Sequence, residues 1–349
     1  MNKNKTLLSE KSERNDALSR PTTRNSDSFG YNERGEIVFS RRDAGSAEDS
    51  YAYDGIGNLQ IAAFYFTTNT YTANSLNQYT SILCDSASHP SSDRLRGSLC
   101  SGDTREISHD PDGNMTSDNI FAYSYDAENR LSSVSPASLT NCAVRVVNAY
   151  DYRNRRIRKT NPTTETTFVY DGWNLINETV ATISGGVTNT TEIQYFWGAD
   201  LSEALQGAGG VGGLLAVSLN GAFYFPSYDN NGNVMKYIDE NGNVVAAYEY
   251  DAFGRIVTQS GSLADFFRHR FSTKYFDLET GLYYYGYRFY SPTLMRWLNR
   301  DPIEERGGLN LYGFCRNRAT CRFDSIGLTS VQINVGAEEK DSPSGGGKW

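Results

Sequence analysis

Three turn sequences group oxygen-bearing side chains in a way that could bind a cation. They read DPDGN from Asp110, DNNGN from Asp229 and DENGN from Asp239. Each resembles the start of a calcium-binding loop, whose full EF-hand form also needs a bidentate Glu at position 12 and flanking helices. Position 12 is Phe121 in the first loop and Glu240 in the second, which strands are expected to flank. The sequence therefore favours structural turns and predicts no metal or cofactor.

The run GAGGVGG, Gly207 to Gly213, contains a formal G-x-G-x-x-G and could bind a nucleotide. That use requires a preceding strand and a following helix. The residues that follow, Leu214 to Leu219, are instead an apolar, strand-like run, and no Gly-Lys-Ser/Thr is present to form a P-loop. We predict a glycine-rich turn where two backbone segments approach closely.

Histidine and cysteine chemistry has little support in the sequence. His89, His109 and His269 lack any H-E-x-x-H or Ser/His/Asp context and are interpreted as surface or turn residues. The five cysteines include no C-x-x-C pair, which disfavours a zinc ribbon. Cys315 and Cys321 are close enough in sequence to pair if oxidised, although reduced buried thiols are the simpler interpretation.

A short unit recurs from Phe29 onward and determines the predicted fold. Clear copies are YDGIGNL from Tyr53, YDAENRL from Tyr125, YDNNGNV from Tyr228 and YDAFGRI from Tyr250. The Asp can accept a backbone N–H two residues later, and the Gly or Asn three residues after it can close the turn in a left-handed conformation. An apolar residue then begins the returning strand of a bulged hairpin, and the Tyr packs on the sheet face.

The composition agrees with this pattern. The 349 residues include 24 Tyr, 17 Phe and 32 Gly, but 9 Pro and 4 Met. Aromatic residues favour strands, while Gly and Asn supply positive-φ turns. We therefore predict an all-β fold, in which antiparallel hairpins form a long, continuous, curved strip. The alternating segment YYYGYRFY, Tyr283 to Tyr290, is predicted to be one of its strands.

Charge and hydropathy limit the expected partners. A net charge of -8 argues against a nucleic-acid partner. Eighteen apolar residues never occur together, so no membrane span is predicted. The first twenty residues have no apolar run of signal-peptide length. We expect export by a specialised system if the chain is part of a longer protein, and a cytoplasmic location otherwise.

The segment from Arg270 to Leu328 resembles the RHS repeat-associated core domain of bacterial RHS/YD-repeat proteins. The hallmark of that domain is F-x-x-K-x-x-D-x-E-T-G-L-Y-Y-Y-x-x-R-x-Y, then D-P, G-G-x-N-L-Y and a closing D-P-x-G-L. The matching residues are Phe271, Lys274, Asp277, Glu279, Thr280, Gly281, Leu282, Tyr283, Tyr284, Tyr285, Arg288, Tyr290, Asp301, Pro302, Gly307, Gly308, Asn310, Leu311, Tyr312, Asp324, Gly327 and Leu328. The resemblance to the family covers about residues 29 to 328.

This resemblance implies a β-strip wrapped into a hollow shell, closed at one end by the core, with a variable C-terminal segment, often a toxin, inside. It also implies aspartic self-cleavage, in which one ionised Asp deprotonates a water and a protonated partner polarises the scissile carbonyl. By motif, Asp301 is the principal acid/base and Asp324 is its partner or positions the cleavage segment. Arg300 would hold a carboxylate or stabilise the oxyanion. The scissile bond would be Leu328–Thr329.

Two departures from the family pattern affect this inference. The closing motif has Ser325 in place of the usual Pro, and Asn317-Arg318-Ala319 replaces the usual N-N-P. Since Pro restricts φ, its loss leaves the segment less pre-set for cleavage. The alternative that Asp301 and Asp324 only stabilise turns stays open.

Two functions are consistent with the sequence. The first is the shell or scaffold portion of a polymorphic toxin protein, with its own C-terminal segment, a fused toxin or other parts of a longer shell as partners. The second is an extracellular module that binds carbohydrate or a cell surface through exposed aromatic residues. A β-propeller is disfavoured because the turn Asp residues are unevenly spaced.

The chain divides by composition into four predicted parts. Residues 1–28 are predicted to be disordered, 29–262 to form the repeat hairpins, 263–328 to form the core, and 329–349 to be a short flexible tail. The tail has 21 residues, no Cys or His and few apolar residues. Segments this short rarely fold alone, so we expect it to hold no toxin domain.

Overall fold

The computed structural model describes residues 13–18, 20–24, 27–42, 47–64, 67–86, 104–137, 145–328 and 330–332. Almost all of this part is antiparallel strand and turn, which confirms the predicted all-β fold. Its helical segments are single 3-10 turns, η2 (Phe271–Thr273), η3 (Glu304–Arg306) and η4 (Cys315–Asn317). No helix among the described residues has the length and hydropathy needed to cross a bilayer.

The first large sheet has nine strands that pair in chain order, each with the next. They are β1 (Glu13–Asn15), β2 (Pro21–Arg24), β3 (Asp27–Tyr31), β4 (Ile37–Arg42), β5 (Ala47–Tyr53), β6 (Leu59–Phe64), β7 (Thr67–Ala73), β8 (Tyr79–Ser86) and β9 (Thr104–Glu106). This order is that of a meander, as hairpin repeats require.

The second large sheet continues the meander through fourteen strands. They are β10 (Ser108–His109), β11 (Met115–Ser117), β12 (Phe121–Tyr125), β13 (Leu131–Pro136), β14 (Val146–Tyr150), β15 (Arg156–Thr160), β16 (Thr164–Asp171), β17 (Asn174–Ser184), β18 (Val187–Trp197), β19 (Leu214–Leu219), β20 (Ala222–Tyr228), β21 (Val234–Asp239), β22 (Val244–Tyr250) and β23 (Ile256–Ser260). The predicted strip is thus divided into two sheets, with the break between β9 and β10.

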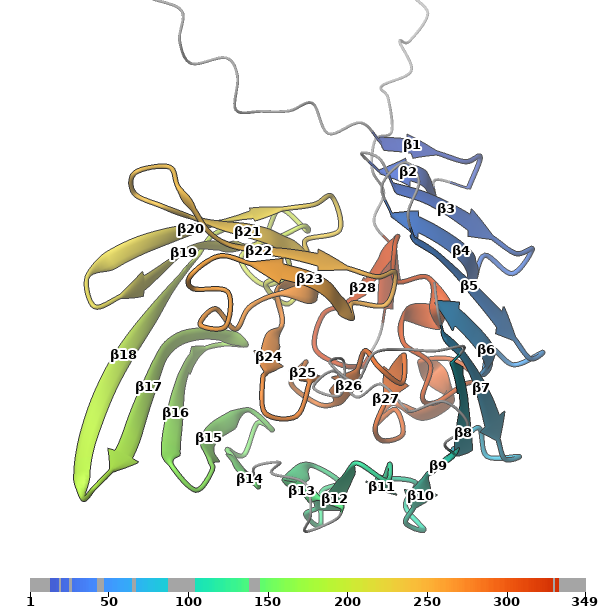
Figure 1. Ribbon diagram of the computed structural model, residues 1–349, viewed down its shortest axis with the longest axis horizontal. Coiled ribbons are helices and arrows are strands. Elements are labelled where there is room, and N and C mark those ends of the chain that lie inside the picture. Colours follow the sequence, from blue (N-terminus) through green and yellow to red (C-terminus); the bar gives the residue numbers. More distant parts are fainter. Residues whose placement is uncertain are drawn as a thin grey trace, which may run out of the picture.

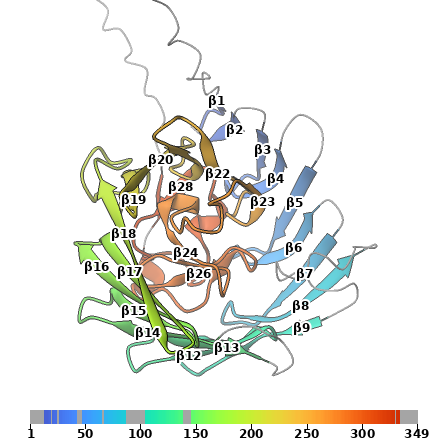
Figure 2. The same cartoon turned by 60° about the vertical axis from the view of Figure 1, so that its left-hand side comes forward.

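Two small sheets lie inside the curve of the strip (Figures 1 and 2). One contains β24 (Tyr275–Asp277), β25 (Leu282–Tyr284), β26 (Phe289–Ser291) and β27 (Arg296–Trp297), and the other contains β28 (Arg322–Asp324) and β29 (Ser330–Gln332). The prediction of one strand from Tyr283 to Tyr290 is wrong. The chain turns back after β25, where Gly286 has φ +108° and the Tyr285 N–H donates to the Arg288 carbonyl.

The Asp turns form as the sequence predicts. The Asp54 carboxylate accepts the N–H groups of Ile56 (3.0 Å) and Asn58 (2.8 Å), and Gly57 has φ +91°. A register shift beside Tyr53 marks the expected bulge. The same carboxylate–amide geometry recurs at Asp110, Asp126, Asp151, Asp229, Asp239 and Asp251. These carboxylates are therefore used within their own turns, which supports the structural interpretation over a calcium loop.

The repeat tyrosines connect neighbouring units by hydrogen bonds. The Tyr53 hydroxyl donates to the Ile37 carbonyl (2.8 Å), and the Tyr250 hydroxyl donates to the Val234 carbonyl (2.7 Å). The acceptor in each case begins the returning strand of the preceding unit. Bonds of the same kind are made by Tyr31, Tyr150, Tyr170 and Tyr228. The Tyr thus has a hydrogen-bonding role as well as the predicted packing role.

Strands begin earlier than the predicted boundary at residue 28, because NDALSR is a further turn unit without its Tyr. Asp16 accepts the N–H groups of Leu18 and Arg20, as the Asp of a complete repeat does. On β2, the buried Arg24 side chain lies 3.3 Å from the Asp229 carboxylate in the turn before β21. β1 and β2 are therefore part of the sheet, while residues 1–12 lie outside the described part.

The last hairpin of the second large sheet contacts the middle strands of the first. Tyr51 of β5 packs edge-on against Phe253 in the β22–β23 turn, with ring centroids 5.1 Å apart. The Arg255 guanidinium lies 3.9 Å from the centroid of the Phe64 ring. The strip therefore curves until it contacts itself and surrounds the small sheets (Figure 2).

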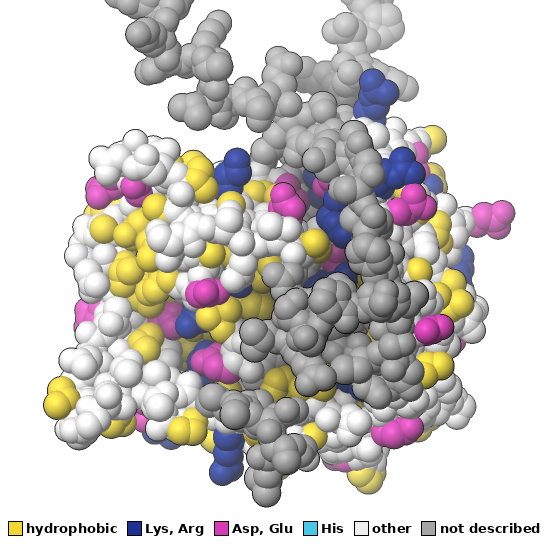
Figure 3. All heavy atoms as spheres, in the orientation of Figure 1, with side chains coloured by type: hydrophobic (Ala, Val, Ile, Leu, Met, Phe, Trp, Pro, Cys, Tyr) yellow, Lys and Arg dark blue, Asp and Glu magenta, His cyan; other side chains and the backbone are white. Residues whose placement is uncertain are grey.

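Aromatic residues of the small sheets fill the centre. The Tyr290 and Phe314 rings stack with centroids 3.9 Å apart, and Trp297 packs against both. All three are fully buried. On the face in Figure 3, acidic and basic side chains are scattered among uncharged atoms, and hydrophobic side chains also reach the surface.

A buried ion cluster attaches the inner sheet to the strip. Arg156 of β15 donates to Asp277 of β24 at 2.6 and 3.2 Å, and Lys159 donates to the same carboxylate at 3.0 Å. Burial opposes ionisation of Asp277, yet these two cations lower its pKa to about 2. Because each charge has a partner, the cluster fixes where the core sits against the repeats.

Candidate functional site

The closing motif begins where β28 ends and is held by its own Asp. The Asp324 Oδ1 atom accepts the N–H groups of Ile326 (3.1 Å), Gly327 (2.6 Å) and Leu328 (3.1 Å). Gly327 has φ +83°, which allows the chain to turn around the carboxylate. The residues just before the predicted scissile bond therefore have a defined path, while Thr329 lies outside the described residues.

Arg288 brings the two candidate aspartates together. Its Nη2 atom lies 2.8 Å from Asp301 Oδ2 and 3.8 Å from Asp324 Oδ2. Its Nε atom donates to the Gly327 carbonyl at 2.6 Å, and the guanidinium lies 4.3 Å from the centroid of the Trp297 ring. Arg288 comes from the turn between β25 and β26 and is buried, so this contact is made away from bulk water.

Asp301 faces the carbonyl of the predicted scissile bond across a small space. Its Oδ1 atom accepts the Ile303 N–H at 3.0 Å, which leaves Oδ2 directed elsewhere. A Cβ atom built on Gly307 would lie 2.5 Å from Asp301 Oδ2 and 3.4 Å from the Leu328 carbonyl oxygen. Both oxygens therefore border the space that a side chain at position 307 would occupy.

The two carboxyl groups hold protons more readily than ordinary aspartates. Burial raises the pKa of Asp324 to about 6, although Arg288 and the backbone N–H groups act in the opposite direction. Burial also raises the pKa of Asp301, against the effect of Arg288. Two buried carboxyl groups beside one guanidinium favour a state that keeps a proton. Such groups can exchange protons with a reacting bond near neutral pH.

Arg300 is not part of this cluster. Its side chain lies beside the Asp110–Asn114 turn, where a Cβ on Gly113 would overlap the Arg300 Nε atom. Arg288 occupies the place beside the carboxylates that the sequence interpretation gave to Arg300. Arg288 was visible in the sequence as the Arg of the motif Y-Y-Y-x-x-R-x-Y. Its position along the chain, however, does not indicate that its side chain contacts Asp301.

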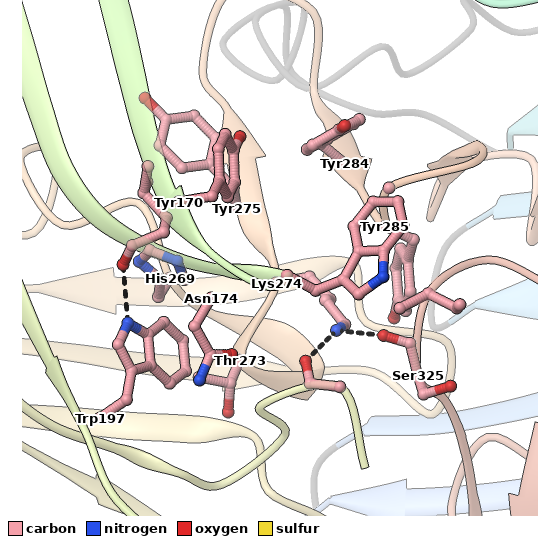
Figure 4. Close-up of a pocket in the computed structure, with 15 residues that line it drawn as sticks. Tyr170, Asn174, Trp197, His269, Thr273, Lys274, Tyr275, Tyr284, Tyr285 and Ser325 are labelled. Atoms are coloured by element: carbon pink, nitrogen blue, oxygen red, sulfur yellow. Dashed lines mark hydrogen bonds between the residues drawn. The ribbon is translucent and has the colours of Figure 1, made fainter. Parts of the chain in front are cut away.

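A pocket of about 50 Å³ lies beside the closing motif (Figure 4). Its lining includes Trp173, Lys274, Tyr285, Ser325 and Ile326. Figure 4 shows Lys274 directed at the Ser325 carbonyl, with its ammonium hydrogen-bonded there. The sequence matched Lys274 to the family motif but gave it no role.

The glycine run has the predicted structural use. Gly209 has φ +63°, and a Cβ there would overlap the carbonyl of Ser325. The Gly207–Gly213 segment therefore approaches the backbone of the closing motif closely, as predicted for a turn between two backbones. Its glycines leave room for that approach and do not open a helix, because β19 follows.

The predicted environments of His and Cys are only partly confirmed. His269 is buried among aromatic rings, 4.7 Å from the Tyr195 centroid, so its assignment to the surface or a turn is wrong. Burial lowers the pKa of His269 to about 3. Cys315 and Cys321 are buried free thiols, while His89 lies outside the described residues. In the described part of the chain, no three His, Cys, Asp or Glu side chains gather into a potential metal site.

Comparison with known proteins agrees with this architecture. The Teneurin YD-shell family model matches residues 209–318. The tRNA3(Ser)-specific nuclease WapA of Bacillus spizizenii is 28% identical over 304 residues, which are 85% of this chain and 12% of that protein. Double-stranded DNA deaminase toxin A of Burkholderia cenocepacia is 27% identical, over 84% of this chain and 20% of that protein. The chain thus spans a minor part of the relatives it matches.

Solved structures share the fold. The crystal structure of TcdB2-TccC3 superposes with a TM-score of 0.59 and 19% identity, covering 90% of this chain and 18% of that chain. The Tc holotoxin pore of Photorhabdus luminescens superposes with a TM-score of 0.56, covering 92% of this chain and 17% of that chain. Residues 209–318 thus match the Teneurin YD-shell family, and most of the chain is similar in sequence to a nuclease and a deaminase toxin and in fold to these toxin shells.

Proposed function

We propose that this chain is the shell portion of an RHS-type polymorphic toxin protein and encloses or presents a variable C-terminal segment. The support is a strip of hairpins that curves into contact with itself around an inner core. Relatives over most of the chain are named as a nuclease and a deaminase toxin, and this chain matches only a minor part of each. We assign residues 329–349 to the presented segment and, from their composition, give them no toxin activity of their own.

We further propose that the core cuts the chain between Leu328 and Thr329. Ionised Asp301 takes a proton from a water molecule as the water oxygen bonds to the Leu328 carbonyl carbon. Protonated Asp324 gives its proton to the carbonyl oxygen, so that the pair keeps one negative charge. As the C–N bond breaks, Asp301 gives its proton to the Thr329 nitrogen and Asp324 takes a proton back from the hydroxyl that becomes the new carboxyl carbonyl. Arg288 stabilises the negative charge that the pair carries throughout.

The space beside Gly307 is the observation that carries this proposal. It places a buried carboxylate oxygen and the Leu328 carbonyl oxygen around one point. A turn-stabilising Asp has no need of such a neighbour, and the Asp turns of the repeats use both carboxylate oxygens within the turn, as Asp54 does.

Intact-mass spectrometry of the purified chain tests the proposal. We expect the wild type to lose 21 residues and the Asp301→Asn variant to keep its full mass. Asp239→Asn is the matched control, because Asp239 lies in an exposed repeat turn that Asn can also form. A full-length wild type after long incubation at mildly acidic and neutral pH would leave only the scaffold function.

A further inference from the structure

Three carbonyl groups of the closing segment each accept a hydrogen bond from a different residue of the core. Lys274 Nζ donates to the Ser325 carbonyl at 2.6 Å, the Tyr287 N–H to the Ile326 carbonyl at 3.0 Å, and Arg288 Nε to the Gly327 carbonyl at 2.6 Å. Together with the three amides on Asp324, these bonds fix the backbone up to the predicted scissile bond.

Lys274 differs from the other two donors because the same donor atom also forms a hydrogen bond to the repeat region. Its ammonium donates to the Gly209 carbonyl at 2.8 Å, so it joins the glycine run to the closing motif (Figure 4). The Asp200 carboxylate also fixes the glycine run, because it accepts hydrogen bonds from the N–H groups of Ala208 (2.8 Å) and Gly210 (3.0 Å). Charge-assisted bonds of this kind are stronger than neutral ones.

We propose that Lys274 is a positioning residue for self-cleavage: it fixes the Ser325 carbonyl and thereby sets the closing segment against Asp324 and Asp301. This inference rests on the proposed self-cleavage. Ser325 lacks the restriction of φ that Pro gives other family members, so the bond from Lys274 is a restraint on this residue that does not depend on Pro.

The ammonium of Lys274 also acts on Asp324 through its charge. Asp324 is surrounded by Arg288, Lys274, Cys315 and Tyr285. The positive charge of Lys274 lowers the pKa of Asp324, and Asp324 and Asp200 favour the charged form of Lys274 against the effect of burial. Burial prevails for the lysine and lowers its pKa to about 8. The neighbouring His269 carries no proton at neutral pH, so it adds no charge.

The test measures the rate at which the shortened chain forms. The full chain is made by pulse-labelled cell-free synthesis and is then diluted into buffers of different pH. In Lys274→Met we expect cleavage slower by roughly tenfold to hundredfold, because the reacting groups lose their alignment. Removing a positive charge raises the pKa of Asp324, so the fall in rate at high pH should move to higher pH. Lys274→Arg keeps the charge and should keep the wild-type pH profile with an intermediate rate.

Lys159→Met is the matched control, since Lys159 is an equally buried ammonium in the separate Asp277 cluster. We expect it to keep the wild-type rate and pH profile. Lys274→Gln replaces Lys274→Met if the latter does not fold. A wild-type rate and pH profile in the uncharged Lys274 variant would overturn the positioning role and leave self-cleavage intact.

A second readout separates this inference from the proposed function. If the wild type stays full length, self-cleavage fails, and amide hydrogen exchange then decides whether Lys274 holds the segment. Faster exchange at residues 326–328 in Lys274→Met, with none in Lys159→Met, supports the positioning contact. Equal exchange in both variants overturns it.

Discussion

At the scale of single residues, the candidate site depends on position 307 being glycine, which has no side chain. Gly307 has φ -76° and ψ -26°, a conformation that alanine adopts without strain. Glycine is needed there only because a larger side chain would fill the space beside Asp301. A substitution at position 307 therefore tests the proposed cleavage chemistry without straining the backbone.

We predict that Gly307→Ala abolishes self-cleavage while the chain stays folded. The added methyl group would lie 2.5 Å from Asp301 Oδ2 and displace the carboxylate from the Leu328 carbonyl. Gly55→Ala is the control, because a Cβ there meets nothing within 4 Å. Circular dichroism and intact mass measure the two properties. A cleaved Gly307→Ala chain would argue that Asp301 does not act at this carbonyl.

The pH dependence of cleavage follows from Asp324. Since burial raises the pKa of Asp324 to about 6, its protonated form dominates below that pH and disappears above it. We predict that the cleavage rate falls as pH rises through about 6. Asp324→Asn, which keeps an acceptor for the three amides, should cleave about a hundredfold or more slowly below pH 6, and the difference from the wild type should shrink above that pH. A rate that climbs steadily from pH 5 to 8 would rule out a protonated Asp324.

At the scale of elements, the Tyr–carbonyl bond is the connection between neighbouring repeats. The Tyr150 hydroxyl donates to the Leu131 carbonyl at 2.6 Å. The buried Tyr125 hydroxyl, at the same place in its own unit, has no hydrogen-bond partner among the described residues. The two positions therefore form a matched pair.

We predict that Tyr150→Phe lowers the free energy of unfolding by about 1 kcal/mol, the usual net value of one hydrogen bond. Tyr125→Phe should be neutral or stabilising, because it removes a buried hydroxyl that lacks a partner. Chemical denaturation of the two variants provides the comparison. Equal losses would show that the bond adds nothing beyond ring packing.

The elements also show what the sequence could predict. The repeat turns were predictable because their Asp, Gly and Asn act on atoms within five residues, as at Asp54 and Gly57. The strand across Tyr283–Tyr290 was predicted wrongly, because the alternating pattern of side chains favours one continuous strand, whereas the chain reverses direction at Gly286. Arg288 and Lys274 were matched but not given roles, since their partners at Asp301 and Gly209 lie in other parts of the chain.

At the scale of the whole molecule, the buried charge cluster sets the position of the core. Asp277 is ionised because Arg156 and Lys159 are beside it. Its folded pKa, about 2, is below the ordinary Asp value. The cluster therefore contributes stability that is fully present above about pH 4 and is lost as pH falls toward 2.

We predict that Arg156→Met destabilises the chain by about 3–5 kcal/mol at neutral pH, because Asp277 is left buried with one cation. The loss should shrink as pH falls below about 4 and the carboxyl accepts a proton. Thermal unfolding across pH measures both effects, with the exposed Arg153→Met as control. An equally large loss in Arg153→Met would remove the special role of the cluster.

The architecture favours enclosure over surface recognition by aromatic rings. The repeat tyrosines that would stack on a sugar, such as Tyr53 and Tyr250, instead donate to backbone carbonyls between strands. The strip closes around the core through Tyr51 and Phe253. This enclosure supports the proposed shell function.

The most direct test of the central claim is the identity of the released fragment. Tandem mass spectrometry of the wild-type chain after purification should find a peptide that begins at Thr329 and ends at Trp349, with a shortened chain that ends at Leu328. Asp301→Asn and Gly307→Ala should release nothing. Cleavage elsewhere, or the same cleavage in Asp301→Asn, would contradict the claim that this core cuts its own chain after the closing motif.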